Sequence, residues 1–318
     1  MPRLDEDRIV QLFASALNVE DLDDVAILKA GGRRFAMKCD MLVKSTDVPP
    51  GMKPQQVARK SIVSCASDFA CKGIKPLAAM VALGLPRDID KKYLNGLAGG
   101  FAAASRQFGV KIIGGDTNES SELVIDCSMI GLADGRIPKR SDAMGGDIVV
   151  TSGPFGLPPS GLKILLEGAR ASESFRKSAL SSVMNPKPAQ KFGALLARYF
   201  SSSMDSSDGL ALSLYSIAQQ SGVDISLHTL PAARGLSEFA SANGTDENSL
   251  IFYGGEEYQI VATIPSARIS LVQRIANANN LDLRVIGSAT EGIGKVYNKK
   301  SLVDRRGYRH FQSNPLPR

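Results

Sequence analysis

The chain has 318 residues, of which 43% are hydrophobic and 22% are charged, a balance that excludes a disordered or fibrous protein. The length favours two domains, each large enough to bury its own core. The acidic start of the chain lacks the apolar run of a signal peptide, and the longest apolar stretch, at 76–86, is too short to cross a bilayer. We therefore expect a cytoplasmic protein.

The net charge of +6 comes from lysines and arginines spread along the chain, and aromatic residues make up only 6%. This pattern does not predict a nucleic-acid surface, and it fits solubility and attraction of a polyanionic ligand such as ATP equally well. With only two histidines, a histidine base or a multi-histidine metal site is nearly excluded. The cysteines lack CxxC spacing, so we expect neither zinc nor disulfides, and we interpret all four as small buried residues: Cys39, Cys65, Cys71 and Cys127.

Helical and strand patterns alternate through the first half of the chain. The predicted elements are a helix at 5–17, strands at 25–28 and 34–43 around a glycine turn, a helix at 54–72, a strand at 77–85, a helix at 91–109, a strand at 110–115 that ends in a turn, and a strand at 123–133. The next segment is rich in turn-forming residues, so we place a domain boundary near residue 137.

The second half repeats this mixture. Its predicted elements are a strand at 147–153, helices beginning near 160 and 186, a strand that leads into a turn at 206–208, an amphipathic helix that ends at Gly222, and strands at 256–265 and 281–290 around a further helix. We expect the Ser-Ser-Asp turn at 206–208 to cap the helix that follows it. The sequence thus predicts an α+β protein with domains 1–137 and 138–318.

Seven aspartates stand at predicted strand ends or in nearby turns, where side chains from distant segments can meet without entering a core. Any one of them alone could be a turn or capping residue. Converging carboxylates repel one another unless cations hold them, and oxygen ligands without histidine or clustered cysteine favour magnesium or calcium over zinc. The implied substrate is a polyphosphate. These aspartates are Asp23, Asp24, Asp40, Asp68, Asp116, Asp205 and Asp208.

Glycines accompany some of these carboxylates, in GGDT at 114–117 and SDG at 207–209, and precede two glutamates in GGEEY at 254–258. A Gly-Gly before an aspartate suits a loop whose amides face a phosphate while the carboxylate holds its metal. An ordinary turn is the alternative for any single Gly-Gly. Neither a Walker A sequence nor a protein-kinase glycine-rich loop occurs, so a nucleotide would be held in another way.

Taken together and in order, these segments resemble those of thiamine-monophosphate kinases, in the superfamily that includes aminoimidazole ribonucleotide synthetase and selenophosphate synthetase. The resemblance covers nearly the whole chain, and TDVPPGM with GGEEY is more similar to archaeal members than to bacterial ones. The matching segments are LDDVAIL (22–28), CDMLV (39–43), TDVPPGM (46–52), ARKSIVSCASDFACKGIKP (58–76), IGGDTNES (113–120), RSDAMGGD (140–147), TSGPFG (151–156), NPKP (185–188), MDSSDGL (204–210), GGEEYQIV (254–261) and GYRHF (307–311).

The resemblance implies a PurM-like architecture, in which strands of an N-terminal α/β domain form a homodimer and a C-terminal α+β domain closes over ATP. The implied magnesium ligands are Asp24, Asp40, Asp68, Asp116, Asp205 and Asp208, with Asp23 beside them. The implied ATP contacts are Gly115, Asp116, Arg140 and Ser207. The implied contacts with thiamine monophosphate are Asp47, Glu256 and Tyr308.

The implied activity is ATP-dependent phosphorylation of thiamine monophosphate to thiamine diphosphate. A phosphate oxygen of the acceptor attacks the γ-phosphorus of ATP in line, while magnesium neutralises charge. Because this oxygen is already ionised near neutral pH, no strong general base is required, and positioning with charge stabilisation carries most of the rate. Arg140 could add a fixed positive group near the phosphates, with a surface charge at the domain boundary as the alternative.

Two other functions stay open, an aminoimidazole ribonucleotide synthetase-like enzyme and a non-catalytic nucleotide-binding regulator. The complete aspartate set argues against the regulator, because clustered carboxylates destabilise a fold that no longer binds metal. Selenophosphate synthetase would need a reactive cysteine beside a lysine in an N-terminal glycine-rich segment, which is absent from this sequence. The hydrogenase-maturation relative would need a C-terminal cysteine, whereas this sequence ends in SNPLPR.

Overall fold

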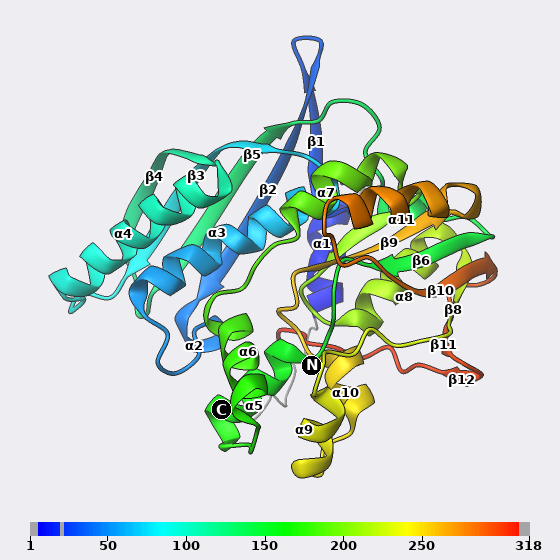
Figure 1. Cartoon of the computed structure of the whole chain (residues 1–318). Coiled ribbons are helices and arrows are strands. Elements are labelled where there is room, and N and C mark those ends of the chain that lie inside the picture. The colour runs from blue at the N-terminus through cyan, green and yellow to red at the C-terminus, as the bar shows by residue number, and fades with distance from the viewer. Residues whose placement is uncertain (1–5, 20–21, 312–318) are drawn as a thin grey trace.

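The structure of the protein, a computed structural model, describes residues 6–19 and 22–311. Its helices pack on two sheets (Figure 1), one with strand order β1-β2-β5-β3-β4 and one with order β12-β11-β8-β10-β6-β9-β7. The prediction of an α+β fold is confirmed. The start of the predicted opening helix and the C-terminal SNPLPR segment lie outside the described residues. Among the described helices, none is long and apolar enough to cross a membrane.

The first sheet is largely antiparallel. Gly31 and Gly32 turn the β1–β2 hairpin, both with positive φ, which glycine adopts without strain. β2 pairs antiparallel with β5, and β5 pairs antiparallel with β3. The edge strand β4 runs parallel to β3 and is reached through α4. The bounds are β1 (Ala26–Ala30), β2 (Arg33–Val43), β3 (Pro76–Leu85), α4 (Lys91–Phe108), β4 (Lys111–Glu119) and β5 (Val124–Leu132).

Helix α3 (Pro54–Cys71), close to its predicted span, joins the two halves of the molecule. Its residues Ile62 and Phe69 are buried in the core of the first sheet, and Ala70 is buried in a core shared with α7 (Gln190–Leu196) and the second sheet. A Cβ atom added at Gly193 of α7 would lie 1.7 Å from the carbonyl oxygen of Ala70. Only glycine therefore permits this close contact between α7 and α3.

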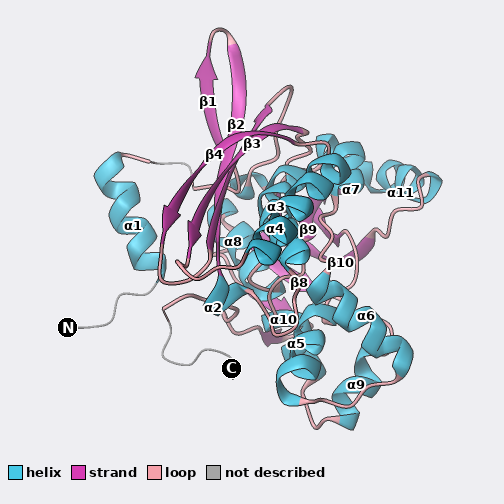
Figure 2. Cartoon of the chain, turned by 90° about the vertical axis from the view of Figure 1, so that its left-hand side faces the viewer, coloured by secondary structure: helices cyan, strands magenta, loops and turns pink. Residues whose placement is uncertain are grey.

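The face of the first sheet opposite α3 exposes apolar side chains in the part of the chain that the structure describes. Figure 2 shows α3 and α4 on one side of this sheet and α1 (Glu6–Leu17) on the other, and α1 buries none of its residues. Met37 and Met41 of β2 and Met80 of β3 are exposed on this open face. We call it the open face of the first sheet. Exposed apolar groups on a sheet are typical of an interaction surface.

The second sheet carries helices between its strands. β5 ends at Leu132 and β6 begins at Asp147, so the boundary predicted near residue 137, which stays a prediction, falls between the two sheets. The strand bounds are β6 (Asp147–Thr151), β7 (Ser203–Ser206), β8 (Val223–Leu227), β9 (Gln259–Pro265), β10 (Arg284–Glu291), β11 (Val296–Asn298) and β12 (Ser301–Leu302). The remaining helices are α2 (Lys44–Asp47), α5 (Leu157–Glu167), α6 (Glu173–Met184), α8 (Leu210–Ser221), α9 (Leu236–Ala242), α10 (Glu247–Tyr253) and α11 (Ile269–Ala278).

Two local predictions are wrong. The strand expected to end in a turn at GGDT continues as β4 to Glu119, because it pairs with β3 as far as Leu85. The N-cap of α8 is Gly209 at φ 111, with no side-chain cap, and not the Ser-Ser-Asp turn. A Cβ atom at Gly209 would lie 2.8 Å from the carbonyl oxygen of Phe252, so packing against α10 decides this helix start. The sequence analysis also did not predict α2, α6, α9, α10, β8, β11 or β12.

Candidate active site

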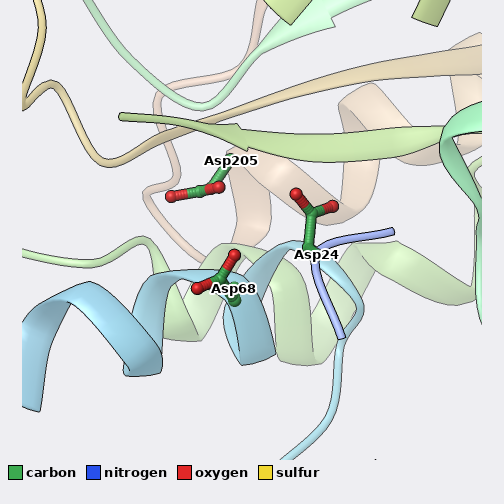
Figure 3. A group of neighbouring side chains, drawn as sticks. All are labelled: Asp24, Asp68 and Asp205. Atoms are coloured by element: carbon green, nitrogen blue, oxygen red, sulfur yellow. The ribbon is translucent and has the colours of Figure 1, made fainter. Parts of the chain in front are cut away.

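Three buried aspartates from distant segments meet where α3 contacts both sheets. Asp24 lies just before β1, Asp68 lies in the last turn of α3, and Asp205 lies on β7. Each offers one carboxylate oxygen, and these oxygens all lie within 4.8 Å of one another. Figure 3 shows the three side chains gathered in one place between α3 and β7. We call these three residues the carboxylate cluster, and all of them belong to the predicted metal-binding set.

The cluster concentrates negative charge in a buried place. Burial and the neighbouring Asp24 raise the pKa of Asp205 to about 7. Burial also raises the pKa of Asp68 well above its usual value, although Lys38 opposes this effect. Burial would raise the pKa of Asp24 too, but Arg140 and Lys72 outweigh it and keep that pKa low. A site made only of oxygen donors that repel one another suits a hard divalent cation such as magnesium.

Two more predicted ligands lie near the cluster. Asp40 lies in the middle of β2, not at a strand end. Burial and Asp47 raise the pKa of Asp40, whereas Lys38 lowers it. Asp40 therefore interacts electrostatically both with Lys38, beside the cluster, and with Asp47, a predicted substrate contact. Asp208 lies in the loop directly after β7 and accepts a hydrogen bond at its carbonyl oxygen from the Tyr308 backbone N–H at 2.9 Å.

Asp23 lies beside the cluster, and its oxygens are engaged by neighbouring groups. Its Oδ1 atom lies 2.6 Å from Nζ of Lys72, and its Oδ2 atom accepts a hydrogen bond from the backbone N–H of Arg140 at 3.2 Å. The Arg140 guanidinium, predicted to contact ATP, donates from Nε to Oδ1 of Asp24 at 3.1 Å. Arg140 thus binds the carboxylate of Asp24, and Asp23 accepts a hydrogen bond from the backbone of Arg140.

Asp116 does not join the cluster within one chain. It lies on the exposed edge strand β4, three strands from β2 in the sheet order. The strand registers put Asp116 in one row with Ala82, Asp126 and the exposed Met41, on the open face. Asp40, which pairs with the buried Cys127, points to the other face. Successive residues of a strand alternate between faces, so Asp116 and Asp40 lie on opposite sides of the sheet.

Gly115, the other predicted ATP contact on β4, has no room for a side chain. A Cβ atom at this position would lie 1.8 Å from the carbonyl oxygen of Val81 on β3. This glycine therefore serves the close pairing of two strands, and the GGDT segment does not form the phosphate-facing loop that the sequence predicted.

The predicted substrate-contacting residues do come together. Nζ of Lys60, on α3, donates to the carbonyl oxygen of Asp47 at 2.6 Å and forms an ion pair with Glu256. A Cβ atom at Gly255, next to Glu256, would lie 3.4 Å from Cβ of Tyr308. Burial, Asp47 and Glu256 raise the pKa of Tyr308 to about 12. Tyr308 also meets the ring of His310 edge-on, with centroids 5.1 Å apart.

The loop after β7 brings this group beside the carboxylate cluster. The backbone N–H of Glu256 donates to the carbonyl oxygen of Ser207 at 2.6 Å, and that of Tyr258 donates to Ser206 at 2.9 Å. The segments MDSSDGL and GGEEYQIV therefore lie side by side, and the predicted ATP contact Ser207 is one of the residues that join them. Next to Glu256 is a cavity of about 370 Å³, whose lining includes Lys177.

Three lysines of this site were not predicted from the sequence, namely Lys38, Lys60 and Lys72. Lys60 and Lys72 are buried and flank residues 61–71 at the end of α3, a stretch in which Asp68 is the one charged residue. A lysine in such a stretch is a usable signal, because a buried ammonium group needs partners. Lys38 stands two residues before Asp40, so both point to the same face of β2.

Comparison with known proteins gives consistent matches. A family model described as AIR synthase related protein, N-terminal domain, matches residues 22–133. The thiamine-monophosphate kinase of Nitrosopumilus maritimus is 38% identical over 315 residues, which cover 98% of this chain and 100% of that protein. The thiamine-monophosphate kinase of Pyrococcus horikoshii is 31% identical over 318 residues, covering 98% of each chain.

Solved structures match equally far along the chain. AaThiL complexed with AMPPCP and TMP superposes with a TM-score of 0.88 at 26% identity, covering 98% of this chain and 99% of that one. Hydrogenase maturation protein HypE of E. coli superposes with a TM-score of 0.71 at 20% identity, covering 98% and 99%, and shares the fold.

The chain shares its two-sheet α+β fold with AaThiL, and its residues 22–133 place this part of it in the class of AIR-synthase-related domains. Within that class, a relative 38% identical over its whole length shows that the chain belongs to the thiamine-monophosphate kinase family. The resemblance inferred from the ordered sequence motifs is confirmed.

Proposed function

We propose that this protein transfers the γ-phosphoryl group of ATP to thiamine monophosphate, which yields thiamine diphosphate and ADP. The observation that carries the proposal is the cluster of Asp24, Asp68 and Asp205, whose carboxylate oxygens lie within 4.8 Å of one another. Its relatives at 38% and 31% identity are named thiamine-monophosphate kinases. AaThiL was solved with AMPPCP, an ATP analogue, and TMP.

We assign Asp24, Asp68 and Asp205 as magnesium ligands, with Asp40 and Asp208 close to them. Magnesium bound there would neutralise charge on the triphosphate during transfer. The three carboxylates come from the N-terminal segment, α3 and β7, so in this proposal the donor phosphates would lie where the two halves of the molecule meet.

We propose that Arg140 and Ser207 contact ATP beside the carboxylate cluster. Gly115 and Asp116, the other two predicted ATP contacts, lie farther from the cluster, on β4. The Arg140 side chain is 22% exposed while it pairs with Asp24, so its remaining N–H groups can meet a phosphate beside the cluster.

For the acceptor, we propose the site formed by Asp47, Glu256 and Tyr308. Thiamine monophosphate carries a cationic ring, which two carboxylates attract and an aromatic face can stack against. The neighbouring cavity of about 370 Å³ can take the rest of the organic part. Because the loop after β7 connects this site to the cluster, the acceptor phosphate can point toward the donor phosphates.

The reaction needs no covalent intermediate on the protein. A phosphate oxygen of the acceptor forms a bond to the γ-phosphorus while the bond from that phosphorus to ADP breaks. The acceptor oxygen is already ionised near neutral pH, so the work of the side chains is to hold two phosphate groups in line against their repulsion. Lys60 holds Asp47 and Glu256 in place for this.

The test is to incubate the protein with ATP, Mg²⁺ and one acceptor at a time, and to measure ADP release together with thiamine diphosphate. Thiamine monophosphate should support both, whereas formylglycinamidine ribonucleotide and selenide should support neither. Turnover with formylglycinamidine ribonucleotide would favour an aminoimidazole ribonucleotide synthetase-like enzyme. Nucleotide binding without any turnover would favour a non-catalytic regulator.

We also propose a homodimer that covers the open face of the first sheet. Met37, Met41 and Met80 are 42%, 61% and 52% exposed there, and a second copy of the chain would bury them. Such a dimer also matches the role that the family resemblance implies for these strands.

A cytoplasmic location is part of the proposal. Its support is that all four cysteines are free thiols, which fits a reducing compartment. Three of them are buried as predicted, and Cys39 is exposed on the open face, contrary to the expectation.

A further inference from the structure

Lys38 places a positive charge inside the acidic site. Its Nζ atom lies 3.1 Å from Oδ2 of Asp68, a member of the carboxylate cluster. The side chain of Lys38 is 26% exposed, whereas that of Asp68 is 5% exposed. Lys38 is therefore the more exposed partner of this ion pair.

The strand positions explain why Lys38 points here. In the β2–β5 register, Lys38 pairs with Met129 and Asp40 pairs with Cys127, and both partners are buried. Lys38 and Asp40 thus extend from the face of the sheet that packs against α3, the helix that carries Asp68. Burial opposes the charge of Lys38, but Asp68, Asp40 and Asp205 favour it and raise its pKa.

The buried lysine nearby is held differently. Lys72 donates to two backbone carbonyl oxygens, those of Pro138 at 3.0 Å and Ser203 at 2.6 Å, and its side chain is fully buried. These two carbonyl contacts hold Lys72 in addition to its ion pairs with Asp23 and Asp24. Lys38 is paired with Asp68 and its side chain is partly exposed, so rotation about its flexible stem can carry the ammonium group outward.

We infer that Lys38 is a positioning residue that acts as an internal counter-ion: it holds the carboxylate cluster together in the metal-free protein and is displaced toward solvent when a divalent cation binds. The inference rests on the proposed magnesium site. Lysine and metal would compete for the same oxygen of Asp68. This competition weakens Mg²⁺ binding. In the metal-free protein, the charge of Lys38 offsets the mutual repulsion of the carboxylates.

The test uses the full chain without nucleotide and Mg²⁺ alone as the probe. Mg²⁺ binding is measured by calorimetric titration, and the melting temperature is measured in EDTA. Lys38→Met should bind Mg²⁺ at least about tenfold more tightly, because the competing charge is gone. The same variant should melt about 5 °C lower in EDTA, because the carboxylates lose their counter-ion. Damage to the fold alone would weaken both properties.

Matched variants separate the explanations. Lys38→Arg keeps the charge and should bind Mg²⁺ like the wild type, and Lys29→Met on the exposed β1 removes one charge far from the cluster and should change neither property. Asp68→Asn should abolish the measured binding and so locate it at the cluster. If Lys38→Met yields no folded protein, Lys38→Gln serves in its place.

The outcomes also separate the two proposals. Wild-type Mg²⁺ binding with unchanged or weaker binding by Lys38→Met overturns the role of Lys38 and leaves the metal site standing. No Mg²⁺ binding by the wild-type protein at any concentration used overturns the metal assignment itself, and the role of Lys38 with it.

Discussion

Lys72 and Asp24 form an ion pair that is fully buried, with Nζ of the lysine 2.8 Å from Oδ2 of the aspartate and both side chains 0% exposed. The lysine comes from the end of α3 and also donates to the carbonyl oxygen of Ser203 on β7, at 2.6 Å. One ammonium group thus connects a cluster aspartate to the second sheet. Lys72 therefore holds Asp24 and β7 at a fixed distance from each other.

Replacing Lys72 by methionine should lower the free energy of unfolding by about 3–5 kcal/mol, because Asp24 would remain buried with less of its compensating charge. Urea denaturation of the full chain measures this. Lys75→Met, three residues later at an exposed position, is the control and should stay within about 0.5 kcal/mol of the wild type. Equal stability of the two variants would show that the buried pair does not contribute as argued.

Replacing Asp68 by asparagine should lower the turnover of thiamine monophosphate by at least about 10²-fold, because a charged oxygen donor of the proposed metal site is lost. In EDTA the variant should melt no lower than the wild type, since burial already disfavours the charge on Asp68. Asp134→Asn, at an exposed position, should leave both properties unchanged. Wild-type turnover by Asp68→Asn would remove this residue from the metal-binding set.

Glu257 should make the protein less stable as the pH rises. Burial raises the pKa of this carboxyl well above its usual value, although the backbone N–H of Gly156 donates to it. The folded protein therefore holds a proton that the unfolded chain releases near pH ~4.3, so stability is lost as the pH climbs from there through the folded pKa. Glu257→Gln keeps an oxygen that can accept the hydrogen bond from Gly156, but it has no carboxyl group that titrates. Its stability relative to the wild type should increase between about pH 5 and pH 8.

The measurement for Glu257 is urea denaturation at a series of pH values, with Glu291→Gln at an exposed position as the control. The control should follow the wild-type curve. If Glu257→Gln runs parallel to the wild type across this range, the buried carboxyl does not titrate as its surroundings require.

The two glycines of GGDT should differ sharply when each is replaced by alanine. A Cβ atom at Gly115 would lie 1.8 Å from the carbonyl oxygen of Val81, whereas one at Gly114 would lie 4.0 Å from the nearest atom, in the Met80 side chain. Gly115→Ala should destabilise the protein by about 1–3 kcal/mol or more, because two strands must separate. Gly114→Ala should be tolerated. Thermal unfolding of both variants checks this, and similar melting temperatures would contradict the close strand contact.

The proposed homodimer should dissociate when Met80 is replaced by glutamate, because a charge would be buried against the second copy. Sedimentation velocity should show the variant as a monomer and the wild type as a dimer. Met144→Glu is a matched control, since Met144 is 60% exposed in the second half of the chain. If wild type and Met80→Glu sediment alike, the open face is not the dimer contact.

Much of the architecture could be predicted from local patterns. The periodic apolar positions predicted α3 nearly to the residue, and the alternation of strand and helix predicted an α+β fold. Prediction failed where a neighbour in space decides the local structure. β4 continues through GGDT because β3 pairs with it, and Gly209 is the N-cap of α8 because α10 leaves no room for a side chain there.

The sequence by itself determined which functional groups are available, namely many aspartates and only two histidines. It also determined the motifs, which follow the order of the thiamine-monophosphate kinase family. Only the tertiary structure decided which carboxylates meet. It joins Asp24, Asp68 and Asp205 and turns Asp116 to the opposite face of the sheet, because strand register sets the direction of each side chain. The tertiary structure also brings Lys38 next to Asp68 and Lys72 next to Asp24. Each ammonium group offsets the negative charge of a buried carboxylate.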